Sequence, residues 1–225
     1  MGFLLMLMTI GGMIAAFVLL SVSLFMKKAW LTKFTLGGIA VWVAFYAVML
    51  LRSSLSSKEK MFGMNEAKEY CGFYLDCHLH TAVTGIRSAK NIGDKQANGR
   101  FYIVNVKVFS NARNPAIAFR LLEPKAELTD GRGQKYVRDT DTESRLPTAQ
   151  VQLNQAIKGG QTIEKEIVFD VAEPATDLKL LITEGYGIDK YIEAVLIDDE
   201  DSLCNKRTFF NIAEQAQTAS QNRER

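Results

Sequence analysis

Two long uncharged segments near the N-terminus constrain this chain more than any other feature of its sequence. Residues 3–26 and residues 34–51 contain no charged side chain, and all 25 acidic residues lie after residue 51. A helix rises about 1.5 Å per residue, so roughly 20 residues cross about 30 Å of hydrocarbon, and both segments are long enough. The short connection KKAWLTK between them predicts a transmembrane helical hairpin over residues 1–52.

Each segment also has another interpretation. The first could be a cleaved signal peptide, but it has no basic start and is followed by lysines rather than by an A-x-A site. The second could be a buried core helix, but Lys33 and Arg52 at its ends suit a membrane span, since both can lie among head groups. We therefore expect two retained spans.

The lysines between the two segments predict the topology. Lys27 and Lys28 directly follow the first segment, and the positive-inside rule puts the connection in the cytoplasm. Arg52, Lys58 and Lys60 beyond the second segment oppose this asymmetry. We expect a two-pass protein of the cell membrane whose C-terminal domain is extracytoplasmic.

The rest of the chain has the alternation of an all-β domain. The serine-rich stretch that opens residues 53–69 predicts a tether, and residues 211–225 are a polar tail. Between them, residues 70–210 contain about seven short segments in which apolar and polar residues alternate. These segments include RFYIVNVKVFSN (100–111), the stretches on either side of Asp130-Gly131, QTIEKEIVFDV, DLKLLIT and YIEAVLID. We expect an antiparallel two-sheet sandwich, with residues 140–160 as its longest irregular connection.

The order of several motifs resembles a known family. NGRFYIVNVKVFSNARNP, LTDGRGQKY, LNQAIKGGQTIEKEIVFDV and the IDDEDSL segment follow one another as in a broad family of bacterial immunoglobulin-like domains of unknown function. The resemblance covers roughly residues 70–210. It implies an immunoglobulin-like sandwich and an extracytoplasmic location, and it brings no catalytic residues with it.

The segment EYCGFYLDCHLHTA (69–82) contains two of the three cysteines and both histidines. As one strand, residues 71–80 would place Cys71 and Cys77 on the inner face and His78 and His80 on the outer face. Six steps along a strand span about 20 Å, so Cys71 can pair with Cys77 only if the chain turns at Gly72. A candidate disulfide joins Cys71 to Cys77 or to Cys204, and the alternative is three buried thiols.

Three sets of residues are candidate metal ligands. His78 and His80, with Asp76, could bind a metal through neutral imidazoles, although the alternative is a solvated polar face. The acidic run of Asp198, Asp199, Glu200 and Asp201 could bind Ca²⁺, as could Asp139, Asp141 and Glu143, but neither set has EF-hand spacing. Acidic loop runs are usually solvated.

The sequence predicts a binding or structural module of the cell envelope rather than an enzyme. It contains no G-x-S-x-G, no H-E-x-x-H and no phosphate-binding loop. We expect no cofactor and no nucleic-acid partner, because beyond Arg52 acidic and basic residues nearly balance. The expected partners are the lipid bilayer and a protein of the envelope. The alternative is an accessory or sensory subunit of a membrane complex such as a transporter.

Overall fold

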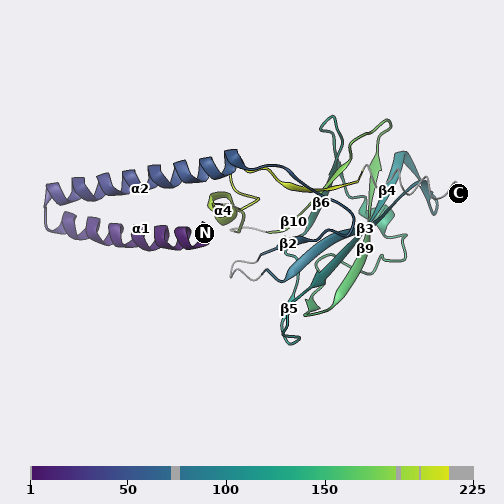
Figure 1. The fold of residues 1–225 in the computed structure, drawn as a ribbon, viewed down its shortest axis with the longest axis horizontal. Helices are drawn as coiled ribbons and strands as arrows, with labels where there is room; N and C mark the ends of the chain where they lie inside the picture. The colour runs from purple at the N-terminus through teal and green to yellow at the C-terminus, as the bar shows by residue number, and fades with distance from the viewer. Residues whose placement is uncertain (1, 72–76, 186–188, 198, 213–225) are drawn as a thin grey trace. The chain divides into compact units, whose positions relative to one another are not determined.

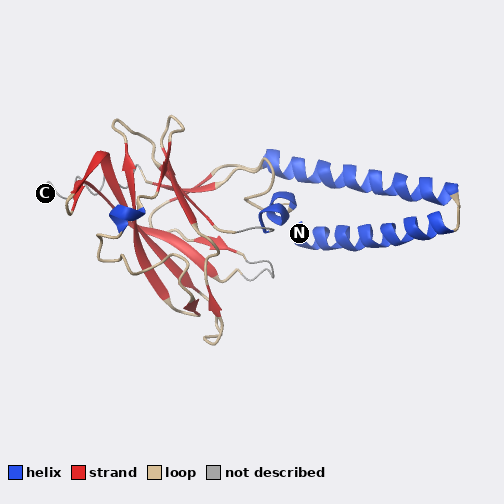
Figure 2. Ribbon diagram, turned by 180° about the vertical axis from the view of Figure 1, so that it is seen from behind, coloured by secondary structure: helices blue, strands red, loops and turns tan. Residues whose placement is uncertain are grey.

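The protein divides into two compact units that interleave along the sequence. The computed structural model describes residues 2–71, 77–185, 189–197 and 199–212 of the 225. One unit, here the helical unit, comprises residues 1–59 and 187–207, and the other comprises residues 60–186 and 208–225. Figures 1 and 2 show two long helices in the first unit and strands in the second.

The helical unit contains an antiparallel helical hairpin. Helix α1 spans Gly2–Phe25 and helix α2 spans Ala29–Ser56, and both are long and apolar enough to cross a membrane. Two polar contacts join them: the Ser23 and Thr32 hydroxyls lie 2.8 Å apart, and Trp42 Nε1 donates to Thr9 Oγ1 at 3.2 Å. Helix α2 continues through residues 53–56, so the prediction of a tether from residue 53 was wrong. Serines are compatible with a helix when, as at Ser56, the hydroxyl donates to the carbonyl three residues back.

A short helix from the other end of the chain belongs to the same unit. Helix α4 spans Asp189–Val195 and lies beside the open end of the hairpin (Figures 1 and 2). The prediction of a strand at YIEAVLID was therefore wrong. Its apolar residues at 191, 192, 195 and 196 also recur at the i, i+4 spacing of a helix, which the alternating pattern conceals.

The other unit is a β-sandwich, as the sequence predicted. Its sheets are a five-stranded sheet in the order β1-β11-β10-β6-β7, a four-stranded sheet in the order β2-β3-β4-β9, and the pair β5-β8. The first sheet contains β1 (Lys60–Phe62), β6 (Lys125–Thr129), β7 (Lys135–Val137), β10 (Lys179–Thr183) and β11 (Thr208–Asn211). The second contains β2 (Lys68–Tyr70), β3 (Leu79–Ile92), β4 (Lys95–Ser110) and β9 (Thr162–Val171). The small pair is β5 (Ala118–Phe119) and β8 (Ile157–Lys158). All neighbours are antiparallel except β1 and β11, which are parallel.

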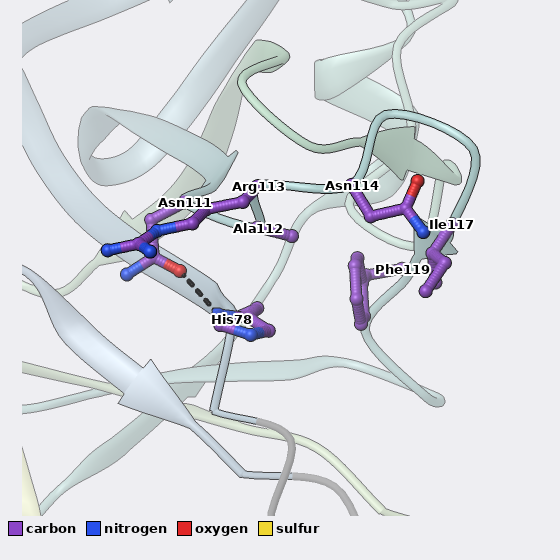
Figure 3. A pocket seen from close by; sticks show the side chains of 7 residues that line it. All are labelled: His78, Asn111, Ala112, Arg113, Asn114, Ile117 and Phe119. Carbon is purple, nitrogen blue, oxygen red and sulfur yellow. Dashed lines mark hydrogen bonds between the residues drawn. The ribbon is translucent and has the colours of Figure 1, made fainter.

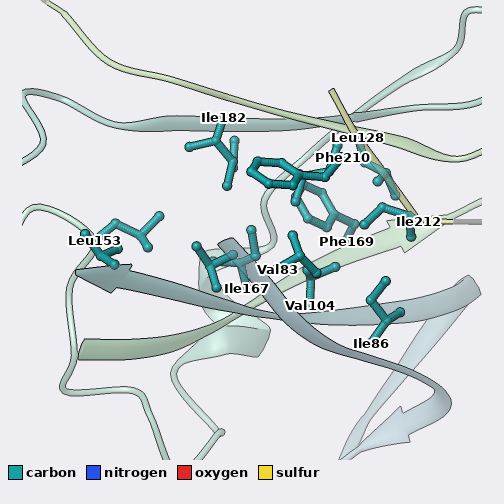
Figure 4. Close-up of a cluster of buried hydrophobic side chains, with 14 of the residues drawn as sticks. Val83, Ile86, Val104, Leu128, Leu153, Ile167, Phe169, Ile182, Phe210 and Ile212 are labelled. Carbon is teal, nitrogen blue, oxygen red and sulfur yellow. The ribbon is translucent and has the colours of Figure 1, made fainter. Parts of the chain in front are cut away.

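The core lies between the two larger sheets. Val83, Val104 and Ile167 of the four-stranded sheet face Leu128 and Phe210 of the five-stranded sheet (Figure 4), and all five are fully buried. Period two along β4 puts its valines on this face. The opposite face of β4 is also covered.

A second apolar cluster covers that opposite face, where Phe101, Ile103 and Val168 pack with Leu146. Residues 140–160 therefore do more than connect strands: they include helix α3 (Thr140–Glu143) and supply Leu146 to this layer. Their apolar residues are too widely spaced to show a period.

The β6–β7 hairpin turns at Asp130-Gly131, as the sequence predicted. The carboxylate of Asp130 accepts hydrogen bonds from the backbone N–H groups of Arg132 and Gln134, both at 2.9 Å, and from the Arg132 guanidinium. Burial raises the pKa of Asp130, but these hydrogen bonds outweigh it and hold the pKa below its usual value. The ionised carboxylate thus organises the turn.

Candidate functional site

Three segments meet at one end of the four-stranded sheet. The start of β3 lies beside the loop that follows β4, because Asn111 N donates to the carbonyl of His78, directly before β3, at 3.1 Å. The Gly159-Gly160 turn before β9 joins the same end, with Gly160 N donating to the carbonyl of Ser110 at 2.9 Å. We call this region the loop end of the sandwich.

The two cysteines of this end do not share a strand. Cys71 follows β2 and Cys77 precedes β3, and these two strands are antiparallel, with Tyr70 opposite Leu79. A disulfide joins the two cysteines, whose Cα atoms lie 4.0 Å apart. The prediction of one strand over residues 71–80 with inward-facing cysteines was therefore wrong, since Cys71 is exposed and Cys77 is half-buried. Cys204 is a free, exposed thiol in the helical unit.

The two histidines differ in exposure, which corrects the prediction that both face solvent. His78 is exposed, and its Nδ1 donates to Asn111 Oδ1 at 2.8 Å, which places a proton on that nitrogen. His80 is buried and stacks on Phe109 with ring centroids 5.0 Å apart. Lys107 extends over the Phe109 ring at 5.2 Å.

A pocket of about 580 Å³ opens at the loop end (Figure 3). His78, Asn111 and Arg113 line one side of it, and Ile117 and Phe119 line the other. The His78 and Phe119 rings pack edge to face, with their centroids 5.9 Å apart, and this contact positions the Phe119 ring. Figure 3 shows the Asn114 amide beside Ile117 and Phe119, while the Arg113 guanidinium and the Asn111 amide extend away from these two apolar side chains. A lining of mixed polar and apolar side chains is typical of ligand sites.

The turn behind the pocket requires glycine at residue 159. A Cβ at Gly159 would lie 2.2 Å from the carbonyl oxygen of Ala112, a pocket residue. The backbones of the two loops are therefore in direct contact. In the sequence, this glycine pair is distinguished only as part of the LNQAIKGGQTIEKEIVFDV motif.

The pocket residues other than His78 were not predicted as a site. Asn111, Arg113 and Asn114 belong to the SNARNP stretch, which the alternation of residues 100–111 and the family resemblance marked as a strand end and a motif, not as a site. Asn-Pro marks a loop, and the arginine and asparagines after a buried strand were the available signal. Ile117, which is exposed in a loop, and Phe119, which is half-buried in β5, carry no signal of this kind, because single apolar residues have many roles.

The predicted metal ligands have other partners in the structure. His78 is bonded to Asn111 and His80 is stacked in a buried layer, while Asp76 lies outside the described residues. A different group places Glu69 with Cys71 and Cys77, whose ligand atoms lie within 4.8 Å of one another, but in the disulfide neither sulfur is a thiolate.

The predicted calcium ligands are similarly engaged. Asp199 Oδ1 accepts the backbone N–H of Asp201 at 2.8 Å, and Asp201 pairs with Arg207 at 3.3 Å. Asp198 lies outside the described residues. In the second set, Asp139 and Asp141 both bind the Lys95 ammonium, at 3.0 and 2.9 Å.

A buried ionic cluster at the β9 side of the sandwich was also missed. Arg138 donates to both carboxylate oxygens of Glu143, at 2.9 and 2.5 Å, and Glu143 Oε1 also accepts the Val168 N–H. Lys165 is buried nearby and donates to the Thr148 carbonyl at 3.0 Å. Burial lowers the pKa of Lys165. These groups line a second pocket, of about 530 Å³.

Comparisons with known proteins bear on the fold but not on a ligand. Residues 76–193, just over half of the chain, match the family described as Domain of unknown function (DUF4352). A search of curated proteins gave no match.

Several solved structures are distantly similar. A secreted protein of Mycobacterium tuberculosis, MPT63, is 12% identical with a TM-score of 0.41, over 69% of this chain and 99% of that one. A conserved hypothetical protein of Bacillus anthracis is 14% identical with a TM-score of 0.39, over 54% and 94%. An uncharacterized β-sandwich protein of Clostridium difficile 630 is 10% identical with a TM-score of 0.39, over 70% and 96%.

Proposed function

We propose, from the premise that this chain belongs to the family described as Domain of unknown function (DUF4352), that it is a membrane-anchored binding module of the cell envelope. In this proposal the helical hairpin crosses the membrane, the sandwich lies outside the cytoplasm, and the pocket at the loop end holds a ligand without transforming it.

The exposed surface of the hairpin supports the anchor. Side chains such as Phe17, Phe34 and Val41 are at least 70% exposed on helices α1 and α2. Exposure of so many apolar side chains to water is unfavourable, whereas a lipid bilayer would remove them from water. The sandwich has its own buried core, so it does not need these side chains to fold.

Two observations support an extracytoplasmic sandwich. Lys27 and Lys28 lie at the bend of the hairpin, which the positive-inside rule assigns to the cytoplasm. The Cys71–Cys77 disulfide would persist in an oxidising compartment and would be reduced in the cytoplasm.

The topology can be tested with single cysteines in a Cys204→Ser background. Val137→Cys places a thiol on β7, where the side chain is 74% exposed, and Trp30→Cys places one at the hairpin bend, where it is 69% exposed. In intact cells a membrane-impermeant maleimide should label position 137 and leave position 30 unlabelled until lysis. The reverse pattern would place the sandwich in the cytoplasm and overturn the proposal.

The pocket carries the binding part of the proposal. Arg113 supplies a cationic group, Asn111 and Asn114 supply amides, and Phe119 supplies an aromatic wall. The first three lie on the loop after β4, and Phe119 lies in strand β5. A small carboxylate with an aromatic or aliphatic part matches this arrangement.

Titration with benzoate tests the pocket, with neutral benzamide as the matched probe. Benzoate should shift backbone amide resonances of residues 111–119 in the full chain in detergent, and Arg113→Gln should weaken its affinity by about tenfold, as for a lost charged hydrogen bond. Arg120→Gln, at an exposed arginine that is not among the pocket-lining residues, is the control. Equal binding to the two arginine variants would sink the assignment.

A further inference from the structure

The segment that returns to the hairpin from the sandwich holds three exposed apolar side chains. In this segment, residues 189–207, Tyr191 is 78% exposed, Val195 is 47% exposed and Leu203 is 58% exposed. Tyr191 and Val195 are four residues apart in helix α4 and so lie on one face. These side chains belong to the same compact unit as the exposed apolar residues of the hairpin.

A hydrogen bond fixes the depth of this segment along helix α2. The hydroxyl of Tyr46 donates to the carbonyl of Val195 at 2.7 Å. Tyr46 precedes Arg52, the first charged residue after the span, by about 9 Å at 1.5 Å per residue. If Arg52 marks the level of the head groups, the end of helix α4 lies at the edge of the hydrocarbon.

The same bond satisfies two groups that an apolar surrounding would otherwise leave unpaired. Val195 is the last residue of α4, so its carbonyl has no partner within the helix. The Tyr46 hydroxyl projects from an otherwise apolar stretch of α2. In hydrocarbon an unpaired polar group is unfavourable, and the hydrogen bond removes this desolvation penalty for both the Val195 carbonyl and the Tyr46 hydroxyl.

Further contacts hold the rest of the segment on α2. The Ser54 and Ser202 hydroxyls lie 3.5 Å apart, and Lys206 N donates to Ser57 Oγ at 2.9 Å. At the same end of the hairpin Met6 and Leu50 are buried, unlike most of their neighbours on α1 and α2. The segment thus has a defined position in the helical unit.

From this geometry we infer that residues 189–207 form a third membrane contact, a short interfacial element that inserts Tyr191, Val195 and Leu203 between lipid head groups and acyl chains. The inference rests on the proposed function, because it requires the hairpin to lie in a bilayer. Acidic residues outnumber basic ones in the segment, so apolar insertion rather than attraction to anionic lipid holds it there.

Fluorophores at single cysteines test the inference in the full chain, in a Cys204→Ser background reconstituted in phosphatidylcholine vesicles. An environment-sensitive label at Tyr191→Cys should be quenched by lipids with a spin label near the head group, at least twofold more than a label at Val137→Cys on β7. A label at Phe17→Cys on α1, within the span, reports the anchor itself when the spin label is placed along the acyl chain of the lipid. Molar salt should leave the quenching at position 191 unchanged.

The outcomes separate the inference from the anchor. Quenching at position 17 with position 191 no different from position 137 overturns the inference and leaves the anchor standing. Absence of quenching at position 17 overturns both. Loss of quenching at position 191 in molar salt would show an electrostatic contact and would also contradict the inference.

A second variant guards against a disturbance by the label. Tyr46→Phe removes the donor to Val195 and should reduce quenching at position 191 by about half while leaving position 17 unchanged. Thr9→Val, which removes the acceptor of the Trp42 bond elsewhere in the hairpin, should leave both positions unchanged. Equal effects of the two variants would show that Tyr46 does not position the segment.

Discussion

Asp130 shows how one carboxylate makes a turn depend on pH. Its folded-state pKa is lowered, so its contribution to stability is present above the unfolded pKa, near 3.9, and is lost as pH falls through the folded value. Asp130→Asn should therefore lower the melting temperature of the full chain in detergent at neutral pH, and the difference from the natural protein should shrink below about pH 4. A difference that stays constant from pH 7 to pH 3, measured by circular dichroism, would contradict this account.

Glu143 is the residue whose loss should cost most among the ionic contacts. Its side chain is 4% exposed and receives both Arg138 nitrogens and the Val168 N–H. Glu143→Gln should lower the free energy of unfolding by about 1–3 kcal/mol, because a charged acceptor in a buried site is lost. The surface pair of Lys135 with Glu127 supplies the control, since Glu127→Gln should cost under about 1 kcal/mol. If denaturant unfolding gave similar losses of unfolding free energy for the two variants, the buried pair would be no more important than the surface pair.

At the scale of elements, the Gly159-Gly160 turn packs directly against the backbone of the loop after β4, so a change in one should displace the other. Gly159→Ala would place a methyl group against the Ala112 carbonyl and should cost about 1–3 kcal/mol, while also displacing the pocket loop. Gly85→Ala is the control, because its Cβ would meet only ordinary contact at 3.8 Å. Thermal unfolding and the benzoate titration should both respond to the first change alone. If the two variants melt alike, the backbone contact is not a constraint.

The elements also show which parts of the fold can be predicted from the sequence. Strand β4 was predicted at 100–111 because its period of two extends over many residues, and the Asp130-Gly131 hairpin because a turn leaves a local signal. Helix α4 was mistaken for a strand because seven residues are too few to separate the two periods. The pocket was not predicted, since it depends on the approach of His78 to the Asn111 loop, a long-range contact with no local pattern.

For the whole molecule, the helical unit interrupts the sandwich between two paired strands. Strand β10 ends at Thr183 and its antiparallel neighbour β11 begins at Thr208. A chain that lacks residues 1–59 and has residues 186–207 replaced by a short glycine-rich turn should therefore be a soluble, folded monomer. A chain that lacks only residues 1–59 should aggregate, because the returning segment loses its partner helix. Light scattering after size-exclusion chromatography separates these outcomes, and aggregation of both would show that the sandwich needs the helical unit.

The interleaved connection also determines how a mechanical load would enter the sandwich. Three chain passages join the two units, and they lead into the start of β1, the end of β10 and the start of β11. Because β1 and β11 are parallel and β10 is antiparallel to β11, all three strands are held from the same end of the sheet. A force between the helical unit and the sandwich would move them together and strain the next ladder, β10 against β6, from Lys179–Thr129 to Thr183–Lys125. That ladder would be sheared along its length rather than opened one hydrogen bond at a time.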